Sequence, residues 1–188
     1  MTAAEADRLI VEFARLVGAQ RVLVVGSQAL HAYYVDPSID TVVESREIDV
    51  IPLPYEAFDK WYFYAHEQLG ADSEFDERHG VYVDMLRERT AKLPRGWENR
   101  VLERRLELES GSPVTAVYPD IHDLLVSKLL ANRPQDEAFL RGVRSLITID
   151  RKTLEERLGS VELPKEKERL RTWATSAIAR IFSRSGAP

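Results

Sequence analysis

The apolar run from Arg21 to Val25, followed at once by Gly26 and Ser27, is the feature that most constrains the fold. Its β-branched residues favour a strand, and a strand with apolar side chains on both sides is buried on both faces of a sheet. Residues 28–33, which come next, have the composition of a short helix. The order strand, tight turn, helix predicts a central strand within a mixed core of strands and helices.

The other segments continue this mixture of patterns. Periodicity, caps and breakers predict strands at residues 47–51, 80–86, 100–108 and 114–117, a loop at 34–46, and helices at 3–17, 55–69, 120–132, 134–146, 150–158 and 164–184. The charges of the last two strands suggest edge positions. We therefore expect an α+β fold: a small mixed β-sheet core over residues 1–118, flanked by helices, and a helical C-terminal region over residues 119–188 that packs on this core.

Composition excludes several classes of protein. The 188 residues include no cysteine, so disulfides, thiolate nucleophiles and cysteine-bound metals are excluded. No stretch is apolar enough to span a membrane, and the acidic start does not resemble a signal peptide, so we expect a cytoplasmic protein. The four histidines lack the spacing of a metal site. Any metal would therefore be held by carboxylates, which favour Mg²⁺ or Mn²⁺.

Three acidic residues fall on predicted strands. Glu47 and Asp49 are separated by one residue, so a strand places both side chains on one face, about 7 Å apart along the chain. Asp84 lies on the strand predicted at 80–86. Carboxylates that share a face repel each other, and a divalent cation between them removes that cost. The alternative is a half-exposed strand whose acids simply face water.

The turn at Gly26 and Ser27 is a second candidate element. A glycine before a helix N-terminus offers backbone N–H groups to a phosphate. The same pair is also ordinary punctuation between a strand and a helix, so the turn alone has two interpretations. Its position ahead of two strands that carry acids favours a site for phosphoryl chemistry.

This order of motifs resembles the nucleotidyltransferase superfamily related to DNA polymerase β. That family has an apolar strand ending in Gly-Ser, a short helix, an acid-x-acid pair on the next strand and a third acid later. Here the motifs read V-L-V-V-Gly26-Ser27, R-Glu47-I-Asp49-V-I and V-Y-V-Asp84. Two features depart from the family pattern: the first acid is glutamate where aspartate is usual, and the interval between turn and acids is long.

A later segment indicates which group within this superfamily the sequence resembles. Residues 123–136 (DLLVSKLLANRPQD) are similar to the D-L-x-x-S-K-L-x-A-x-R-x-x-D segment of bacterial proteins related to the toxin of the AbiE type IV toxin–antitoxin and phage-defence systems. Residues 93–100 (LPRGWENR) are similar to a segment of uncharacterised relatives in that group. The resemblance covers roughly residues 20–147.

The resemblance implies roles for the residues of the core. Glu47 and Asp49 would bind two Mg²⁺ (or Mn²⁺) ions that hold a nucleoside triphosphate. Asp84 would share the catalytic metal and help to activate the acceptor hydroxyl. Gly26 and Ser27 would cradle the β- and γ-phosphates.

The resemblance also implies roles in the helical region. Lys128 matches the family lysine that reaches the phosphates, Asp136 matches a nearby family acid, and Arg133 is a further candidate for nucleotide binding. From the residues alone, Lys128 is equally compatible with a surface lysine whose stem lies along an apolar helix.

The activity implied by the resemblance is the transfer of a nucleoside monophosphate from an NTP to a hydroxyl, with release of pyrophosphate. The acceptor would be RNA, such as a tRNA 3′ end, which would make the protein a toxin with a cognate antitoxin as partner. Two alternatives stay open. One is the same chemistry on a small molecule, as in antibiotic-modifying enzymes, and the other is a catalytically inactive binding protein with this fold.

The charge distribution bears on RNA binding. The net charge of −5 argues against a surface that coats nucleic acid as a whole. The helix predicted at 164–184 is basic, however, and either guides an RNA backbone or presents a solvated face. Its cations are Lys165, Lys167, Arg169, Arg171, Arg180 and Arg184.

Overall fold

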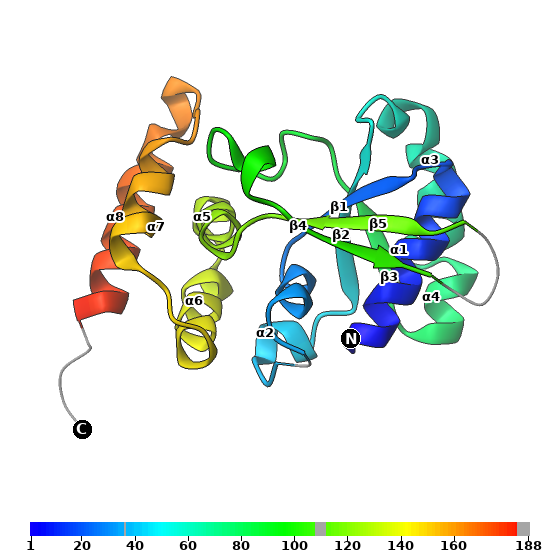
Figure 1. Cartoon of the computed structure of the whole chain (residues 1–188), viewed down its shortest axis with the longest axis horizontal. Coiled ribbons are helices and arrows are strands. Elements are labelled where there is room, and N and C mark those ends of the chain that lie inside the picture. Colours follow the sequence, from blue (N-terminus) through cyan, green and yellow to red (C-terminus); the bar gives the residue numbers. More distant parts are fainter. Residues whose placement is uncertain (36, 108–111, 184–188) are drawn as a thin grey trace. The chain divides into compact units, whose positions relative to one another are not determined.

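The computed structural model describes residues 1–35, 37–107 and 112–183. The chain divides into two compact units (Figure 1). The first comprises Met1–Ala91 and Val101–Pro119, and the second comprises Lys92–Arg100 and Asp120–Pro188. The short stretch 92–100, which lies between strands in the sequence, thus groups with the helices that follow the sheet.

The first unit is built on a five-stranded mixed sheet in the order β3-β2-β1-β5-β4. Strand β1 pairs antiparallel with β2 and parallel with β5, while β2 and β3 are parallel and β4 and β5 antiparallel. This mixed sheet with helices confirms the α+β fold. The strands are β1 (Arg21–Val25), β2 (Glu47–Leu53), β3 (Tyr82–Met85), β4 (Leu102–Leu106) and β5 (Val114–Tyr118).

One of the two strands expected at an edge lies inside the sheet. Strand β4, whose sequence LERRL carries three charges, is an edge strand as predicted. Strand β5 is interior, between β1 and β4, so the edge prediction for it is wrong. Its sequence VTAVY has no charged residue, and all of its residues except Thr115 are buried. Leu108, the predicted end of the fourth strand, lies outside the described residues.

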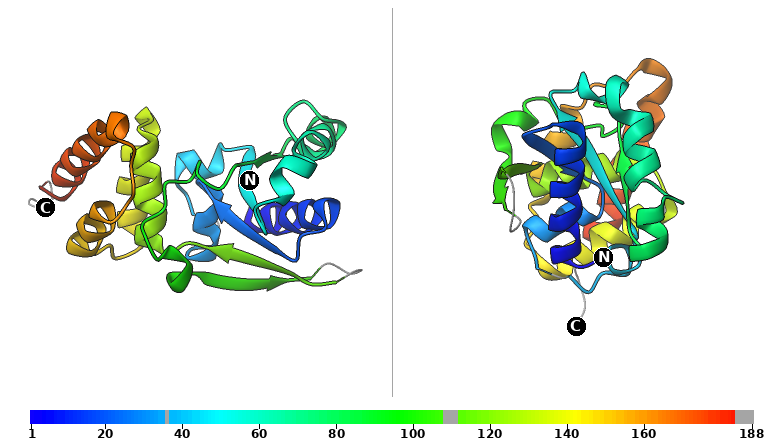
Figure 2. Two further views of the ribbon diagram at one scale, coloured as in Figure 1. Left: turned by 90° about the horizontal axis from the view of Figure 1, so that it is seen from above. Right: turned by 90° about the vertical axis from the view of Figure 1, so that its right-hand side faces the viewer.

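Helix α1 (Ala3–Val17) begins and ends where its local signals predict. Thr2 and Glu5 form the capping box, and Gly18 ends the helix in the left-handed conformation with φ 66°. The helix contacts strands β1, β2, β3 and β5, and it also contacts helix α3 (Ala57–Leu69), which lies on β2 and β3 (Figure 2). Two helices that touch each other and the same sheet cover the same face of that sheet.

The segment between β1 and β2 is more structured than the loop expected at 34–46. After the 3₁₀ helix η1 (Gln28–Ala32) the chain forms the short helix α2 (Asp40–Val43). The Gln28 amide donates to the carbonyls of Val42 (2.9 Å) and Ser45 (3.4 Å) and so holds this segment against η1. The further helix α4 (Glu74–His79) precedes β3.

The second unit is helical. Helix α5 contacts α6, α7 and α8, so its sides are almost entirely enclosed. Asp150 caps α7 and Pro134 stands in the first turn of α6, as their sequence signals predict, and Asp120 caps α5. The elements are η2 (Trp97–Arg100), α5 (Ile121–Ala131), α6 (Pro134–Leu146), α7 (Arg151–Gly159), η3 (Lys165–Lys167) and α8 (Glu168–Ser183). Arg184 lies outside the described residues.

None of the helices in the described part of the chain combines the length and apolar character that crossing a membrane requires.

Candidate functional site

The Gly26 turn and the acid-bearing strand meet at one place. Asp49 lies opposite Val25 in the antiparallel register of β1 and β2, next to the end of β1. A Cβ atom on Gly26 would lie 1.7 Å from Asp49 Oδ2, and Gly26 has φ 70°. Only glycine fits this close approach and this backbone conformation. The long interval in the sequence between the turn and the acids therefore does not separate them in space. Strand β2 pairs antiparallel with β1, and this pairing brings Asp49 back to the end of β1.

The three predicted acids lie on one face of two neighbouring strands. Glu47 and Asp49 alternate with the fully buried Ile48, so they share the other, half-exposed face of β2. In the parallel pairing of β2 with β3, Asp84 lies opposite Asp49. Burial raises the pKa of Asp84, and the nearby negative charge of Glu47 raises it further. The face therefore concentrates negative charge, which is the electrostatic condition for binding a cation.

A tyrosine that the sequence analysis did not select contacts the first acid. Tyr82 lies opposite Glu47 in the register, and its hydroxyl donates to Glu47 Oε2 at 3.1 Å. Burial, together with the Glu47 charge, raises the pKa of Tyr82 to about 12, so the hydroxyl keeps its proton at neutral pH. The Arg46 guanidinium lies over the tyrosine ring, 5.8 Å from its centroid. The sequence held one signal that could have identified this tyrosine: Tyr82 and Asp84 are separated by one residue on a predicted strand, so their side chains share a face.

Ser27 follows Gly26 and is buried. It stands at the start of η1, but its side chain makes no capping hydrogen bond there. Because η1 is a 3₁₀ helix of five residues, its N-terminus offers a weaker dipole than the longer helix that the sequence suggested. The close approach of Gly26 to Asp49 is therefore a stronger feature of this turn than its helix.

The three candidates in the helical unit also come together. Lys128 is only 6% exposed, and its Nζ lies 4.0 Å from Asp136 Oδ1 and 4.9 Å from the centroid of the Phe139 ring. Asp136 is fully buried and accepts from the backbone N–H of Arg133 at 2.9 Å. The interpretation of Lys128 as an exposed surface lysine is wrong, because Asp136 balances its charge inside the unit.

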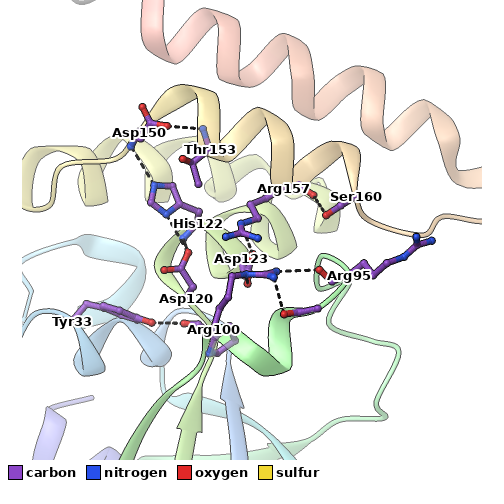
Figure 3. A network of polar contacts seen from close by, with 12 residues as sticks. Tyr33, Arg95, Arg100, Asp120, His122, Asp123, Asp150, Thr153, Arg157 and Ser160 are labelled. Carbon is purple, nitrogen blue, oxygen red and sulfur yellow. Dashed lines mark hydrogen bonds and ion pairs between the residues drawn. The ribbon is translucent and has the colours of Figure 1, made fainter.

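A second polar cluster in this unit was not anticipated (Figure 3). Asp123 is fully buried, accepts from Arg100 Nε at 2.9 Å, and lies 3.6 Å from Arg157 Nε. Arg100 also donates to the carbonyls of Gly96 (2.7 Å) and Arg95 (3.2 Å). The cluster thus joins the 92–100 stretch to α5 and α7, which explains why this stretch belongs to the helical unit.

The basic last helix uses two of its cations internally. Arg171 donates to the carbonyls of Leu158 and Val161, and Arg180 pairs with Glu137. The remaining cations of this helix that the structure describes are exposed, whereas Ile178 and Ile181 are buried and Leu170 and Trp173 half-buried. The helix predicted at 164–184 is divided into η3 and α8: the exposed cations are Lys165 and Lys167, which lie in η3, and Arg169, which lies in α8. This arrangement favours a solvated face over a dedicated RNA track.

The donor chemistry of the acid-bearing face fits a hard divalent cation. Glu47, Asp49 and Asp84 supply carboxylate oxygens, which Mg²⁺ and Mn²⁺ prefer. Burial is the main cause of the raised pKa of Asp84, and repulsion by the charge of Glu47 is the second. A cation on this face would relieve that repulsion. Within residues 1–35, 37–107 and 112–183, however, no three His, Asp or Glu side chains are grouped closely enough to hold a metal. The carboxylates would therefore have to move together around the ion.

Comparison with known proteins agrees with the order of these motifs. Residues 5–178 match the model of a family described as "Nucleotidyltransferase of unknown function (DUF6036)". No curated protein and no solved structure matches the chain. Because the match covers most of the chain, the protein belongs to this family of nucleotidyltransferases.

Proposed function

We propose that this protein transfers a nucleoside monophosphate from an NTP to a hydroxyl group in a reaction that depends on Mg²⁺. One observation carries the proposal: the Asp49 carboxylate lies directly on the backbone of Gly26 and opposite Asp84. A glycine turn and two carboxylates on neighbouring strands therefore occupy one place, which is an arrangement suited to phosphoryl transfer.

The reaction has a simple balance. The acceptor oxygen forms a bond to the α-phosphorus of the NTP, the bond from that phosphorus to the oxygen bridging the β-phosphate breaks, and pyrophosphate leaves. The proton of the acceptor hydroxyl goes to Asp84. Glu47, Asp49 and Asp84 would hold Mg²⁺ (or Mn²⁺), which supplies charge neutralisation on the phosphates.

The remaining residues bind and orient the nucleotide. The backbone at Gly26 and Ser27 is proposed to hold the β- and γ-phosphates. In the helical unit, Lys128 is proposed as a phosphate-binding residue, with Arg133 beside it. Asp136 is proposed to orient the ammonium group of Lys128, which the 4.0 Å separation of Nζ and Oδ1 supports.

We propose RNA, and first of all a tRNA 3′ end, as the acceptor. The similarity of residues 123–136 to the corresponding segment of AbiE-type toxins supports this choice. On this proposal the protein is a growth-inhibiting toxin, its further partner is a cognate antitoxin, and it acts in the cytoplasm, where NTPs and tRNA are found. Expression should then arrest growth, and Asp49→Ala should abolish the arrest.

The test of the activity is direct. The protein is incubated with each labelled NTP, Mg²⁺ and total tRNA, and the label on RNA is followed. Asp49→Ala should reduce transfer by at least about 100-fold, because it removes charge stabilisation at the reacting phosphate. Glu88→Ala, at an exposed acid of the same unit, is the matched control and should retain activity. Transfer by Asp49→Ala at the wild-type rate would overturn the proposal.

The same assay separates the kinds of acceptor. A second arm replaces tRNA by a small polyhydroxylated molecule such as an aminoglycoside. Transfer to RNA should weaken steeply as salt rises, because binding an RNA backbone releases counterions. Label on the small molecule alone, with no such salt dependence, would contradict the RNA acceptor while preserving the chemistry.

A further inference from the structure

Tyr82 is joined to the candidate metal ligand Glu47 by geometry that the strands impose. The two residues lie side by side in the parallel register of β2 and β3, and the hydroxyl donates to Oε2 at 3.1 Å. This register fixes which residue of β3 can reach Glu47. The contact therefore belongs to the sheet itself.

Glutamate at this position creates a need for such a contact. Compared with aspartate, Glu47 has one more rotatable bond, so its carboxylate samples more orientations and loses more entropy when a cation fixes it. Metal sites hold their carboxylate ligands in place with hydrogen bonds from neighbouring groups. The hydroxyl of Tyr82 is placed to do this from the adjacent strand, and it engages only one oxygen of the carboxylate, Oε2.

The ring of Tyr82 is in turn contacted by Arg46, which other residues hold in place. The Arg46 guanidinium lies 5.8 Å from the ring centroid, donates through Nε to the Gly80 carbonyl at 2.9 Å, and pairs with Asp76. Asp76 is buried and also accepts from the backbone N–H of Asp72 at 3.2 Å. A continuous set of contacts thus runs from α4 through Arg46 and Tyr82 to the Glu47 carboxylate.

We propose that Tyr82 is a positioning residue for Glu47: its hydroxyl restrains the carboxylate on the acid-bearing face, so that the side chain has less freedom to lose when the three carboxylates close around the divalent cation. The inference rests on the proposed function. It assigns to Tyr82 the task of compensating for the longer side chain at this position. Arg46 supports that task by restricting the ring.

The test measures Mn²⁺ binding to the full-length protein in the presence of a non-hydrolysable NTP analogue, and the Mg²⁺ dependence of transfer. Tyr82→Phe should raise the Mn²⁺ dissociation constant by about 10-fold. It should raise the Mg²⁺ concentration for half-maximal rate by a similar factor, with kcat at saturating Mg²⁺ close to that of the wild type. Tyr62→Phe, in a half-buried ring that stacks on Phe58, is the matched control and should change neither value.

A double-mutant cycle distinguishes positioning from general support of the fold. In the Glu47→Asp background the shorter side chain no longer reaches the hydroxyl, so adding Tyr82→Phe should cause no further loss of Mn²⁺ affinity. An equal loss in both backgrounds, or unchanged Mn²⁺ affinity in Tyr82→Phe, would overturn the inference. Arg46→Met is a second probe that keeps the hydroxyl, and it should weaken Mn²⁺ binding by less than Tyr82→Phe does.

The two proposals fail in different ways. If the wild-type protein neither binds Mn²⁺ with the NTP analogue nor transfers label, the proposed function is wrong. If the wild type does both and depends on Asp49, while Tyr82→Phe matches it, only the assignment of Tyr82 is wrong.

Discussion

The Nε atom of Arg100 lies 2.9 Å from Oδ2 of Asp123 and joins two segments 23 residues apart in the sequence. Both belong to segments that the sequence analysis singled out, residues 93–100 and residues 123–136. Arg157 completes the cluster from α7, with Nε 3.6 Å from Asp123 Oδ1. The two motifs are therefore parts of one structural element, a buried carboxylate between two guanidinium groups (Figure 3).

Removing the central carboxylate should destabilise the helical unit strongly. Asp123→Ala leaves Arg100 and Arg157 without their counterion in a largely buried setting, at an expected cost of about 3–5 kcal/mol in the free energy of unfolding. Urea denaturation followed by circular dichroism measures this. Glu162→Ala breaks the exposed pair with Arg95 and is the control, with an expected cost below about 1 kcal/mol. Equal effects of the two variants would contradict the role of the cluster.

Two glycines with similar backbone angles should respond differently to alanine. A Cβ atom added to Gly18 (φ 66°) would meet no other atom within 4 Å, whereas a Cβ atom on Gly26 (φ 70°) would lie 1.7 Å from Asp49 Oδ2. Gly18→Ala should cost about 1–2 kcal/mol through backbone strain alone. Gly26→Ala should cost about 1–3 kcal/mol more, because the side chain of Asp49 must move.

Activity provides the second readout for this pair. At a temperature where both variants are folded, Gly26→Ala should lose nucleotidyl transfer and Gly18→Ala should keep it. The same loss of stability and the same activity in both variants would show that the contact between Gly26 and Asp49 is unimportant.

Lys128 should affect nucleotide affinity beyond its effect on stability. Lys128→Met keeps the length of the buried stem and removes the charge, so on the proposed function it should weaken NTP binding by at least about 10-fold, or 1.4 kcal/mol. Isothermal titration with a non-hydrolysable NTP analogue measures this. Lys152→Met, at an exposed lysine of the same unit, is the control. A Lys128→Met protein that unfolds more easily but binds the analogue normally would assign Lys128 a purely structural role.

The acid stability of the helical unit should depend on Asp120. Burial raises the pKa of Asp120, but the hydrogen bonds from His122 outweigh this effect and hold the pKa below its ordinary value of 3.8. Because the folded state lowers this pKa, Asp120 contributes stability above about pH 4. That contribution is lost as the pH falls through the folded-state pKa.

Asp120→Asn tests this dependence. The variant keeps a side chain that can cap the helix but loses the negative charge, so it should be less stable than the wild type by about 0.3–1 kcal/mol at pH 6, and the difference should shrink as the pH falls below 3.8. Urea unfolding at a series of pH values measures it. A difference that stays constant from pH 6 to pH 3 would contradict the assignment.

Local chemistry allowed much of the fold to be predicted from the sequence. The capping box of Thr2 and Glu5, the cap at Asp150 and the apolar run at 21–25 each depend on residues a few positions apart. The prediction failed where position in the sheet mattered. Strand β5 was expected at an edge but lies between β1 and the edge strand β4. Its own five residues do not determine which strands pair with it.

The sequence by itself identified the kinds of residue in the candidate site: a Gly-Ser turn, acids spaced by one residue, and a lysine on an apolar helix. Only the tertiary structure decided their neighbours. The approach of Asp49 to Gly26, the hydrogen bond from Tyr82 to Glu47, and the burial of Lys128 against Asp136 depend on strand register and helix packing. These relationships join residues through space, and their energies arise only once distant segments are brought together, so no local pattern encodes them.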